Sequence, residues 1–553
     1  MPISRADVVH EAVYTTPVQT HSSLETHGGV VDHRGDSATV YASTQGTSSA
    51  RDGLGGPLGL GQGDFELVCE YVGGGFGSKL GGPGKEITLA ARLAARHKRP
   101  AYLFCNRSEE HLDTGNRPSC RVLVRVGFKK DGTAVGGEIR TWGGTGVANG
   151  GGGASIPSRR YTLGEIKKIH EDVGFNGGGP RAFRAPGHPQ AAFAEELMLD
   201  EIAAKLDKDP LEFRKGLVSA EFRRMLDAGA RLIGWNDRRP NGSQRRVVRT
   251  GYGCGVTGWG SAGPGGAAEV VIFRDGSVES RTGTQDIGTG QRTGMGIVTA
   301  DALGIPLRYV SVKIGRSSLP PGPGSGGSVT SPTTAPTMAA VARNARQQLF
   351  EVLANEAGGK AEEFDIREGV VLRNGQRYLS WEEACGKLPN DGIVANKGKG
   401  ERGDGHSNGV QFVKLDVDTD TGVIHVRHVV AIQSCGRVIC RKTAESQIIG
   451  GVIQGLSYAL FENKLLDRNT GAMVNDNFES YKILGPNDMP HIEPILWSKG
   501  QTGVKALGEP PTIPTAGATA CALFNAIGRP VRDLPLTPAK VLAALEAGEG
   551  GAA

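Results

Sequence analysis

A carboxylate near the C-terminus, Glu509, lies in a sequence suited to holding it in one place. It belongs to the segment Lys-Ala-Leu-Gly-Glu-Pro-Pro at residues 505–511, with glycine before it and two prolines after it. Each proline fixes its own φ and disfavours helical geometry in the residue before it, so we predict an extended Glu509 on a stiff loop. A carboxylate held in this way can act as a general base towards one atom. Taken alone, the segment is better explained as a proline-rich turn with a solvated glutamate.

Four glycine-rich segments are the other candidates for chemistry. They occupy residues 70–79, 176–190, 283–291 and 322–331, each beside a predicted strand or helix. Glycine lets the backbone approach a bulky ligand, and the N–H groups of such loops can bind anions. The first segment lacks the glycine spacing of a dinucleotide-binding or Walker loop, and residues 80–84 delay the next helix. Taken one at a time, these loops are better explained as structural turns.

The length and composition of the chain exclude several classes of protein. At 553 residues it exceeds the roughly 250–300 residues of a single core, so two large domains are expected. Its 85 glycines follow no Gly-X-Y period, which argues against collagen. The net charge of +5 comes from well-mixed charges, so no nucleic-acid partner is expected. Without a leader or a long apolar run, we expect no membrane span and a cytoplasmic location, with export on a partner subunit left open.

The cysteines indicate reduced thiols. Eight are scattered along the chain with no Cys-x-x-Cys pair, and even the closest two, Cys435 and Cys440, have no second pair to complete a ligand set. We therefore expect neither a structural zinc nor an iron-sulfur cluster bound by this chain alone.

Turn and periodicity signals predict an α+β fold of two large mixed domains. The polar, basic stretch at 236–249 is predicted to link a first domain at 1–235 to a second at 250–553. Hairpin turns are predicted at residues 131–132, 275–276, 374–375 and 420–422. Helices are predicted at about 87–97, 191–206, 337–357 and 540–546, the third with an apolar stripe from Met338 to Val352.

The order of the loops adds information that no single loop carries. Ser-Thr-Gln-Gly at 43–46, Gly-Gly-Phe-Gly at 74–77, Ala-Phe-Arg-Ala-Pro-Gly at 182–187, the two later glycine loops and Gly-Glu-Pro-Pro at 508–511 follow one another along the chain. In this order they resemble the molybdenum-binding subunit of the xanthine dehydrogenase and aldehyde oxidase family of molybdenum hydroxylases. The resemblance extends from about residue 12 to about residue 538.

The resemblance implies a molybdopterin cofactor at the interface of the two domains, with the cytosine dinucleotide form as an open alternative. The metal is then held by the pterin dithiolene, so no direct protein ligand is expected. By the same resemblance Gln45 hydrogen-bonds a molybdenum oxygen, while Phe76 and Arg184 line the metal site. Matches to cofactor-contacting loops are Gly75, Gly77, Gly288, Thr289 and Ser328.

The resemblance also implies a reaction. Glu509 would be the general base, removing a proton from a hydroxyl group on molybdenum whose oxygen attacks an electrophilic carbon. Such a carboxylate should lie in a partly desolvated pocket with a raised pKa. The product is a hydroxylated small molecule with water as the oxygen source. Two electrons then leave the site, which implies an iron-sulfur partner subunit with a 2Fe-2S cluster and, beyond it, an FAD subunit.

Departures from the family pattern narrow the range of expected substrates. Leu80 replaces the glutamate of purine-oxidising relatives, Pro186 replaces an aromatic residue that stacks the substrate, and Ala185 replaces the cysteine of carbon monoxide oxidisers. Thr289 stands where some relatives have glutamine near the cofactor, and aldehyde-oxidising bacterial relatives also tolerate this replacement. An aldehyde or an N-heteroaromatic compound is therefore expected.

Other departures favour an alternative without catalysis. Family subunits usually begin with an additional domain before the segment matching residues 14–45, and Ser434 and Cys440 replace more usual family residues. A noncatalytic scaffold subunit that retains the fold is thus the main alternative, and a nucleotide-binding enzyme using the glycine loops is the weakest one.

Overall fold

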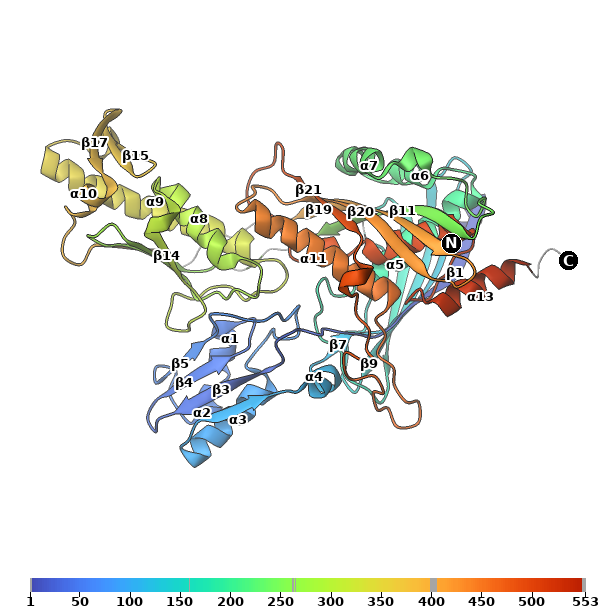
Figure 1. The fold of residues 1–553 in the computed structure, drawn as a ribbon, viewed down its shortest axis with the longest axis horizontal. Helices are drawn as coiled ribbons and strands as arrows, with labels where there is room; N and C mark the ends of the chain where they lie inside the picture. Colours follow the sequence, from blue (N-terminus) through green and yellow to red (C-terminus); the bar gives the residue numbers. More distant parts are fainter. Residues whose placement is uncertain (1, 159, 261–262, 264, 398–404, 550–553) are drawn as a thin grey trace.

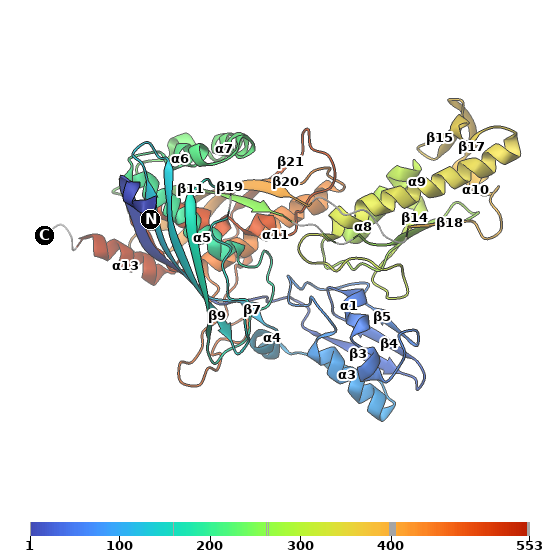
Figure 2. The same ribbon diagram turned by 180° about the vertical axis from the view of Figure 1, so that it is seen from behind.

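The computed structural model describes residues 2–158, 160–260, 263, 265–397 and 405–549, and it divides into three parts. Figures 1 and 2 show a first lobe (residues 28–104, blue), a second lobe (268–397, yellow-green) and a central body formed by the remaining described residues. Each part has its own apolar cluster. The prediction of mixed helices and sheets is confirmed.

The first lobe is a four-stranded sheet backed by a helix. The sheet has the order β5-β4-β3-β6, formed by Phe65–Val68, Ala38–Ala42, Gly28–His33 and Ala101–Phe104. Helix α3 (Gly84–His97) buries Ile87 and its alanines beside β3, and the short helices α1 (Thr47–Asp52) and α2 (Gly55–Leu58) lie nearby. The helix begins at Gly84, so residues 80–83 delay it after the glycine loop, as predicted.

The second lobe packs two helices on a four-stranded sheet of order β14-β13-β12-β18. The strands are Val310–Lys313, Val278–Arg281, Ala268–Ile272 and Ile393–Lys397, and the helices are α8 (Gln291–Leu303) and α9 (Thr330–Ala357). A three-stranded sheet of β15 (Phe364–Arg367), β16 (Val370–Arg373) and β17 (Gln376–Ser380) and helix α10 (Trp381–Cys385) complete it.

Helix α9 begins seven residues before the predicted start, because Pro336 does not break it. The hydroxyls of Thr334 and Thr337 donate to the carbonyls of Thr330 and Thr333 one turn earlier, which adds hydrogen bonds to the turns around Pro336. Pro336 itself has no N–H to donate to the carbonyl one turn before it. Of the predicted stripe from Met338 to Val352, the residues up to Leu349 are buried and Val352 is partly buried.

The central body places two buried helices between two sheets. One sheet, of order β1-β8-β9-β10, is formed by Val8–Thr16, Cys120–Phe128, Ala134–Gly146 and Glu165–Gly174. The other, of order β11-β19-β20-β21, is formed by Val248–Trp259, Ser407–Asp418, Ile424–Ser434 and His491–Trp497. Helix α5 (His188–Lys205) contacts β1 and β11, and α12 (Thr515–Ile527) contacts α5, β11 and β19. Helix α11 (Arg441–Leu460) lies against α12 and β21.

Glycines in β11 explain how closely α12 approaches this sheet. A Cβ at Gly251 would lie 1.9 Å from the carbonyl oxygen of Ala522, and one at Gly253 would lie 2.2 Å from that of Ala518. Both distances are far below van der Waals contact, so only glycine fits at these two positions.

The remaining elements belong to the central body, apart from two 3-10 turns at 307–309 and 361–363 in the second lobe. They are α4 (Arg107–Asp113), α6 (Pro210–Leu217), α7 (Ala220–Ile233), α13 (Pro538–Glu549), the paired strands β2 (Gln19–Thr20) and β7 (Asn116–Arg117), and the 3-10 turns η1 (Pro2–Arg5), η2 (Trp235–Asp237), η3 (Leu307–Tyr309), η4 (Ala361–Glu363), η5 (Pro486–Asp488) and η6 (Pro510–Thr512). In the described part of the chain, no helix combines the length and apolarity needed to span a bilayer.

The predicted hairpins at 131–132, 275–276, 374–375 and 420–422 all join antiparallel strands. The polar stretch at 236–249 runs from η2 towards β11, but the main apolar cluster draws residues from both sides of it. The boundary in this stretch stays a prediction.

Candidate active site

A cavity of about 750 Å³ lies where the two lobes and the central body meet. All nine residues singled out in the sequence line it. They are Gln45, Gly75, Phe76 and Gly77 from the first lobe, Gly288, Thr289 and Ser328 from the second lobe, and Arg184 and Glu509 from the central body. Segments separated by more than 450 residues are thus brought to one place, and the folded chain has a candidate active site there.

Glu509 is held in this wall by contacts from two other loops. Its Oε1 accepts the backbone N–H of Ala185 at 3.1 Å, and its Oε2 accepts the hydroxyl of Ser328 at 2.9 Å. Burial raises the pKa of Glu509 above its usual value, while these two hydrogen bonds and the charges of Arg184 and Arg117 oppose the increase. The carboxyl group therefore combines a fixed position with a raised pKa, as a general base requires.

The prediction of an extended backbone at Glu509 is wrong. Its φ of −106° and ψ of −41° lie in the right-handed helical region, where it caps the 3-10 turn η6. Proline disfavours this geometry in the preceding residue. Here the N–H of Glu509 donates to Ser328 Oγ at 2.9 Å, and its carbonyl accepts the N–H of Thr512. These bonds, together with the two on the carboxylate, outweigh the local preference.

Ser328 therefore has a second function beside that predicted from the sequence. Its side chain was predicted to contact the cofactor, but its hydroxyl both donates to the carboxylate of Glu509 and accepts its backbone N–H. The residue lines the cavity and positions Glu509.

Arg184 connects three segments of the wall. Its guanidinium donates to the carbonyl of Gly508, the side chain of Gln454 at 3.0 Å and the carbonyl of Gln447 at 2.9 Å. Burial lowers the pKa of Arg184 to about 10, so it stays charged at neutral pH. This side chain fixes the glycine that precedes Glu509.

Two residues of the wall, and one next to it in the chain, have an unusual backbone conformation. Phe76, Ala185 and Ser328 have φ values of +52°, +61° and +58°, in the left-handed region that L-residues rarely adopt. At Ala185 this conformation accompanies the N–H that binds Glu509. Such geometry costs on the order of 1–3 kcal/mol per residue and is found preferentially at functional sites, which supports the assignment of this cavity.

Gln45 is fixed by the glycine loop that it faces. Its Oε1 accepts the N–H groups of Gly77 at 2.9 Å and Lys79 at 3.2 Å, and its Nε2 donates to the carbonyl of Ser325 at 2.6 Å. The side chain is almost fully buried. One N–H of the amide has no partner among these contacts and remains for a ligand.

The donors of the cavity fit the molybdopterin group. Helices α9 and α11 begin at the cavity, and neither N-cap residue, Val329 or Cys440, makes a side-chain cap. Uncapped N–H groups at a helix start bind phosphate. A Cβ on Gly288 would meet no atom within 4 Å, so this loop leaves open space beside its backbone. The wall thus offers backbone and hydroxyl donors, which a phosphate group of the pterin requires. This fits a cofactor whose metal is held by the pterin and not by protein side chains.

Some lining residues were not found from the sequence. Trp259, Gln447 and Gln454 line the cavity, and buried Arg117 supports the wall by donating to the carbonyl of Arg184 at 2.9 Å. Gln447 and Gln454 stand in the segment Ser-Gln-Ile-Ile-Gly-Gly-Val-Ile-Gln-Gly at 446–455, which also resembles the family and is a weak signal. For Trp259 and Arg117 no sequence signal pointed to the site.

Comparison with known proteins agrees with this geometry. Two family models described as molybdopterin cofactor-binding domain match residues 2–216 and 228–490. The chain is 29% identical over 573 residues to the aldehyde oxidoreductase molybdenum-binding subunit PaoC of Escherichia coli strain K12, covering 97% of this chain and 76% of the relative. It is 26% identical to the nicotine 6-hydroxylase large subunit of Paenarthrobacter nicotinovorans, covering 98% and 74%.

Solved structures share the fold. Quinoline 2-oxidoreductase from Pseudomonas putida 86 matches with a TM-score of 0.87 at 20% identity, covering 99% of this chain and 77% of the other. The carbon monoxide dehydrogenase of Oligotropha carboxidovorans matches with a TM-score of 0.89 at 20% identity, covering 100% and 76%. The ordered loops, the cavity and the two domain matches together show that this chain belongs to the molybdopterin-dependent oxidoreductases, as a molybdenum-binding large subunit of the xanthine dehydrogenase and aldehyde oxidase family.

Proposed function

We propose that the chain is a molybdenum hydroxylase catalytic subunit that hydroxylates an aldehyde or an N-heteroaromatic compound, using water as the oxygen source. The observation that carries the proposal is Glu509, a carboxylate of raised pKa held by Ala185 and Ser328 in the wall of the cavity. The names of similar proteins include an aldehyde oxidoreductase, a nicotine 6-hydroxylase and a quinoline 2-oxidoreductase, so both substrate classes are represented among them.

Different residues of this chain would accept the proton and bind the cofactor. The bound molybdenum cofactor, in its simple or cytosine dinucleotide form, supplies the two-electron acceptor and the oxygen that is transferred. Glu509 accepts the proton released in the reaction, and its two hydrogen bonds aim the carboxylate into the cavity. Gln45 offers an amide N–H towards the metal side. The loops with Gly75, Gly77, Gly288 and Thr289 and the start of α9 bind the pterin and its phosphates.

The apolar side chains of the cavity wall favour a neutral, partly apolar substrate. Apolar side chains that line it are Leu80, Pro186, Trp259, Ile439, Val504 and Leu507. Leu80 and Pro186 are the two positions where purine-oxidising relatives place a glutamate and a stacking aromatic ring. A leucine cannot hydrogen-bond a purine, so xanthine should be a poor substrate.

The electrons leave through partner subunits. The eight cysteines, all in the described part of the chain, form no disulfide, and six of them are buried. None of them belongs to a cluster of three possible metal ligands among the described residues. An iron-sulfur subunit carrying 2Fe-2S and an FAD subunit beyond it would complete the path.

The test is substrate-dependent reduction of an artificial electron-accepting dye by protein purified with its partner subunits, with molybdenum quantified in the same sample. We expect about one molybdenum per chain, turnover of an aromatic aldehyde or a quinoline-type heterocycle, and little turnover of xanthine. Protein without molybdenum after co-expression with the cofactor machinery would refute the proposal. Full molybdenum loading without turnover of either substrate class would favour the scaffold alternative.

The pH dependence of turnover gives a further prediction. A base acts when deprotonated, so kcat/KM should fall as the pH drops through the pKa of Glu509. Because that pKa is raised above the ordinary value of 4.5, the fall should occur above pH 4.5. The hydrogen bond from Ser328 stabilises the charged carboxylate, so Ser328→Ala should move the midpoint to higher pH. A pH profile of both proteins checks this, and a midpoint that stays unchanged or moves down would contradict the assigned base.

A further inference from the structure

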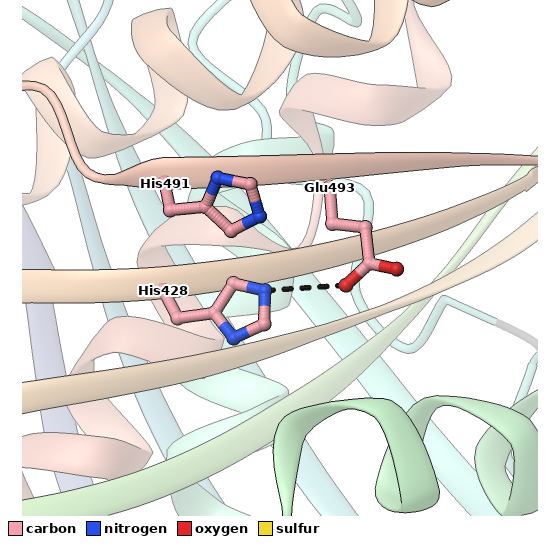
Figure 3. Close-up of side chains that lie close together, drawn as sticks. All are labelled: His428, His491 and Glu493. Atoms are coloured by element: carbon pink, nitrogen blue, oxygen red, sulfur yellow. Dashed lines mark ion pairs between the residues drawn. The ribbon is translucent and has the colours of Figure 1, made fainter.

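Two imidazoles and one carboxylate gather on the central body, on strands that lead towards the cavity but outside its lining (Figure 3). His428 lies on β20, and His491 and Glu493 lie on the neighbouring strand β21. One ligand atom from each of the three lies within 4.8 Å of the other two. Among the residues that the structure describes, no other group of three histidine, cysteine or acidic side chains is gathered in this way.

The backbone places these side chains together. Strands β20 and β21 are parallel, and their register pairs His428 with His491 and Val430 with Glu493. Residues two apart on a strand point to the same face, so His491 and Glu493 share a face, and His428 lies beside His491 on it. The two imidazole ring centroids are 4.9 Å apart. The convergence is therefore a property of the sheet and needs no loop to rearrange.

One nitrogen in this group has a long polar contact. His428 Nε2 is shielded from solvent and forms an ion pair with Glu493 Oε2 at 3.3 Å, drawn dashed in Figure 3. This distance lies just beyond the range of a good N–H···O hydrogen bond, which is about 2.7–3.2 Å. Ligands about 2.0–2.1 Å from a tetrahedral zinc ion are about 3.4 Å from one another. The observed separation is thus that of two ligands with a small cation between them.

We propose that His428, His491 and Glu493 form a binding site for a divalent transition-metal ion, with Zn²⁺ as the ion that fits this ligand set. Two imidazole nitrogens and one carboxylate oxygen are a known three-ligand set for zinc, which leaves the fourth position to water. His491 is exposed, so it can rotate inward to close the set and leaves an entry path from solvent.

The charges around the group are compatible with a cation. Lys414 on β19 is the cross-strand partner of His428, and its positive charge disfavours a proton on that imidazole, which leaves the ring neutral as a metal ligand requires. Its Nζ lies 5.3 Å from the ring centroid of Tyr252, against which it packs. The carboxylate of Glu493 faces His428, so a bound dication would be partly neutralised.

The position of the site indicates a structural role. Strand β21 is an edge strand, bonded in its sheet only to β20, and the ion would tie the two strands together at the start of their pairing. Strand β20 leads into the cavity wall at residues 435–447, and β21 leads towards the wall at 504–509. From His428 to the end of β20 is about 20 Å at about 3.3 Å per residue, too far for the ion to take part in chemistry.

Zinc titration of the purified full chain, stripped with a chelator, tests the site. Calorimetry and competition with a chromophoric chelator should show that the wild type binds one more Zn²⁺ than His491→Ala. The affinity at this site should fall at least about 100-fold in the variant, because losing a ligand costs more than the 10–100-fold typical of outer-shell changes. Since His491 is exposed, the fold of the variant should be unchanged, and its melting temperature without zinc verifies this.

His425→Ala provides the matched control. His425 is an exposed histidine on the same strand, three residues from His428, and is not part of the group. It should bind zinc as the wild type does, while Glu493→Gln should weaken binding as His491→Ala does. Equal zinc stoichiometry and affinity in the wild type and His491→Ala would overturn the site. Equal losses in His425→Ala and His491→Ala would also overturn it, because they would indicate nonspecific surface binding.

Discussion

Replacing Glu509 by glutamine should lower kcat by about 10²–10⁴-fold, the usual contribution of a general base, and leave the molybdenum content at the wild-type level. Glutamine has the same shape, and its carbonyl oxygen can still accept the N–H of Ala185. The hydroxyl of Ser328 can reverse its role and accept from the new amide group, because a hydroxyl both donates and accepts. The wall should therefore stay intact while the proton acceptor is lost.

Dye-linked turnover and molybdenum analysis on the same preparation check this expectation. Glu479→Gln, a change of the same chemistry at an exposed residue, is the control and should behave as the wild type. If Glu509→Gln kept wild-type turnover, Glu509 would not be the base. If turnover were absent from both the wild type and the variant at full molybdenum loading, the chain would be the noncatalytic scaffold.

Replacing Gly77 by alanine should reduce molybdenum content and activity together, by tenfold or more. Gly77 has a φ of +116°, and a Cβ built on it would lie 2.2 Å from the carbonyl oxygen of Ala182. Backbone cannot yield as a side-chain tip can, so the loop at 74–77 must move away from the segment that carries Arg184. That movement would also disturb the N–H that Gly77 donates to Gln45. The residues that surround the cofactor would then lose their alignment.

Gly81→Ala is the matched control for backbone strain. Gly81 also has a positive φ, +75°, but a Cβ there would meet no atom within 4 Å. It should cost about 1–2 kcal/mol of stability and keep the molybdenum content near the wild-type level. Similar losses of molybdenum in both variants would mean that strain, and not the contact with Ala182, controls loading.

The sequence could predict the parts of this structure that depend on local signals. The Asp-Gly and Asn-Gly turns, the apolar stripe of the helix after Pro336 and the delay before α3 each follow from nearby residues. The nine site residues could be named because their motifs stand in family order, and the fold brings all nine to one cavity.

Features that depend on distant contacts could not be predicted. The helical backbone of Glu509 follows from hydrogen bonds with Ser328 and Ala185, which are more than 180 residues away in the chain. Trp259 and Arg117 reach the site only through the packing of the central body, and neither stands in a motif. Local preference was overridden in each case by tertiary hydrogen bonds or packing.

The position of molybdenum in crystals of the loaded enzyme tests whether this cavity holds the cofactor beside Glu509. It can be measured by anomalous scattering at the molybdenum absorption edge. We expect one strong peak in the cavity, between the side chain of Gln45 and the carboxylate of Glu509, with no protein atom bonded to the metal. A peak outside this cavity, or one remote from Glu509, would contradict it.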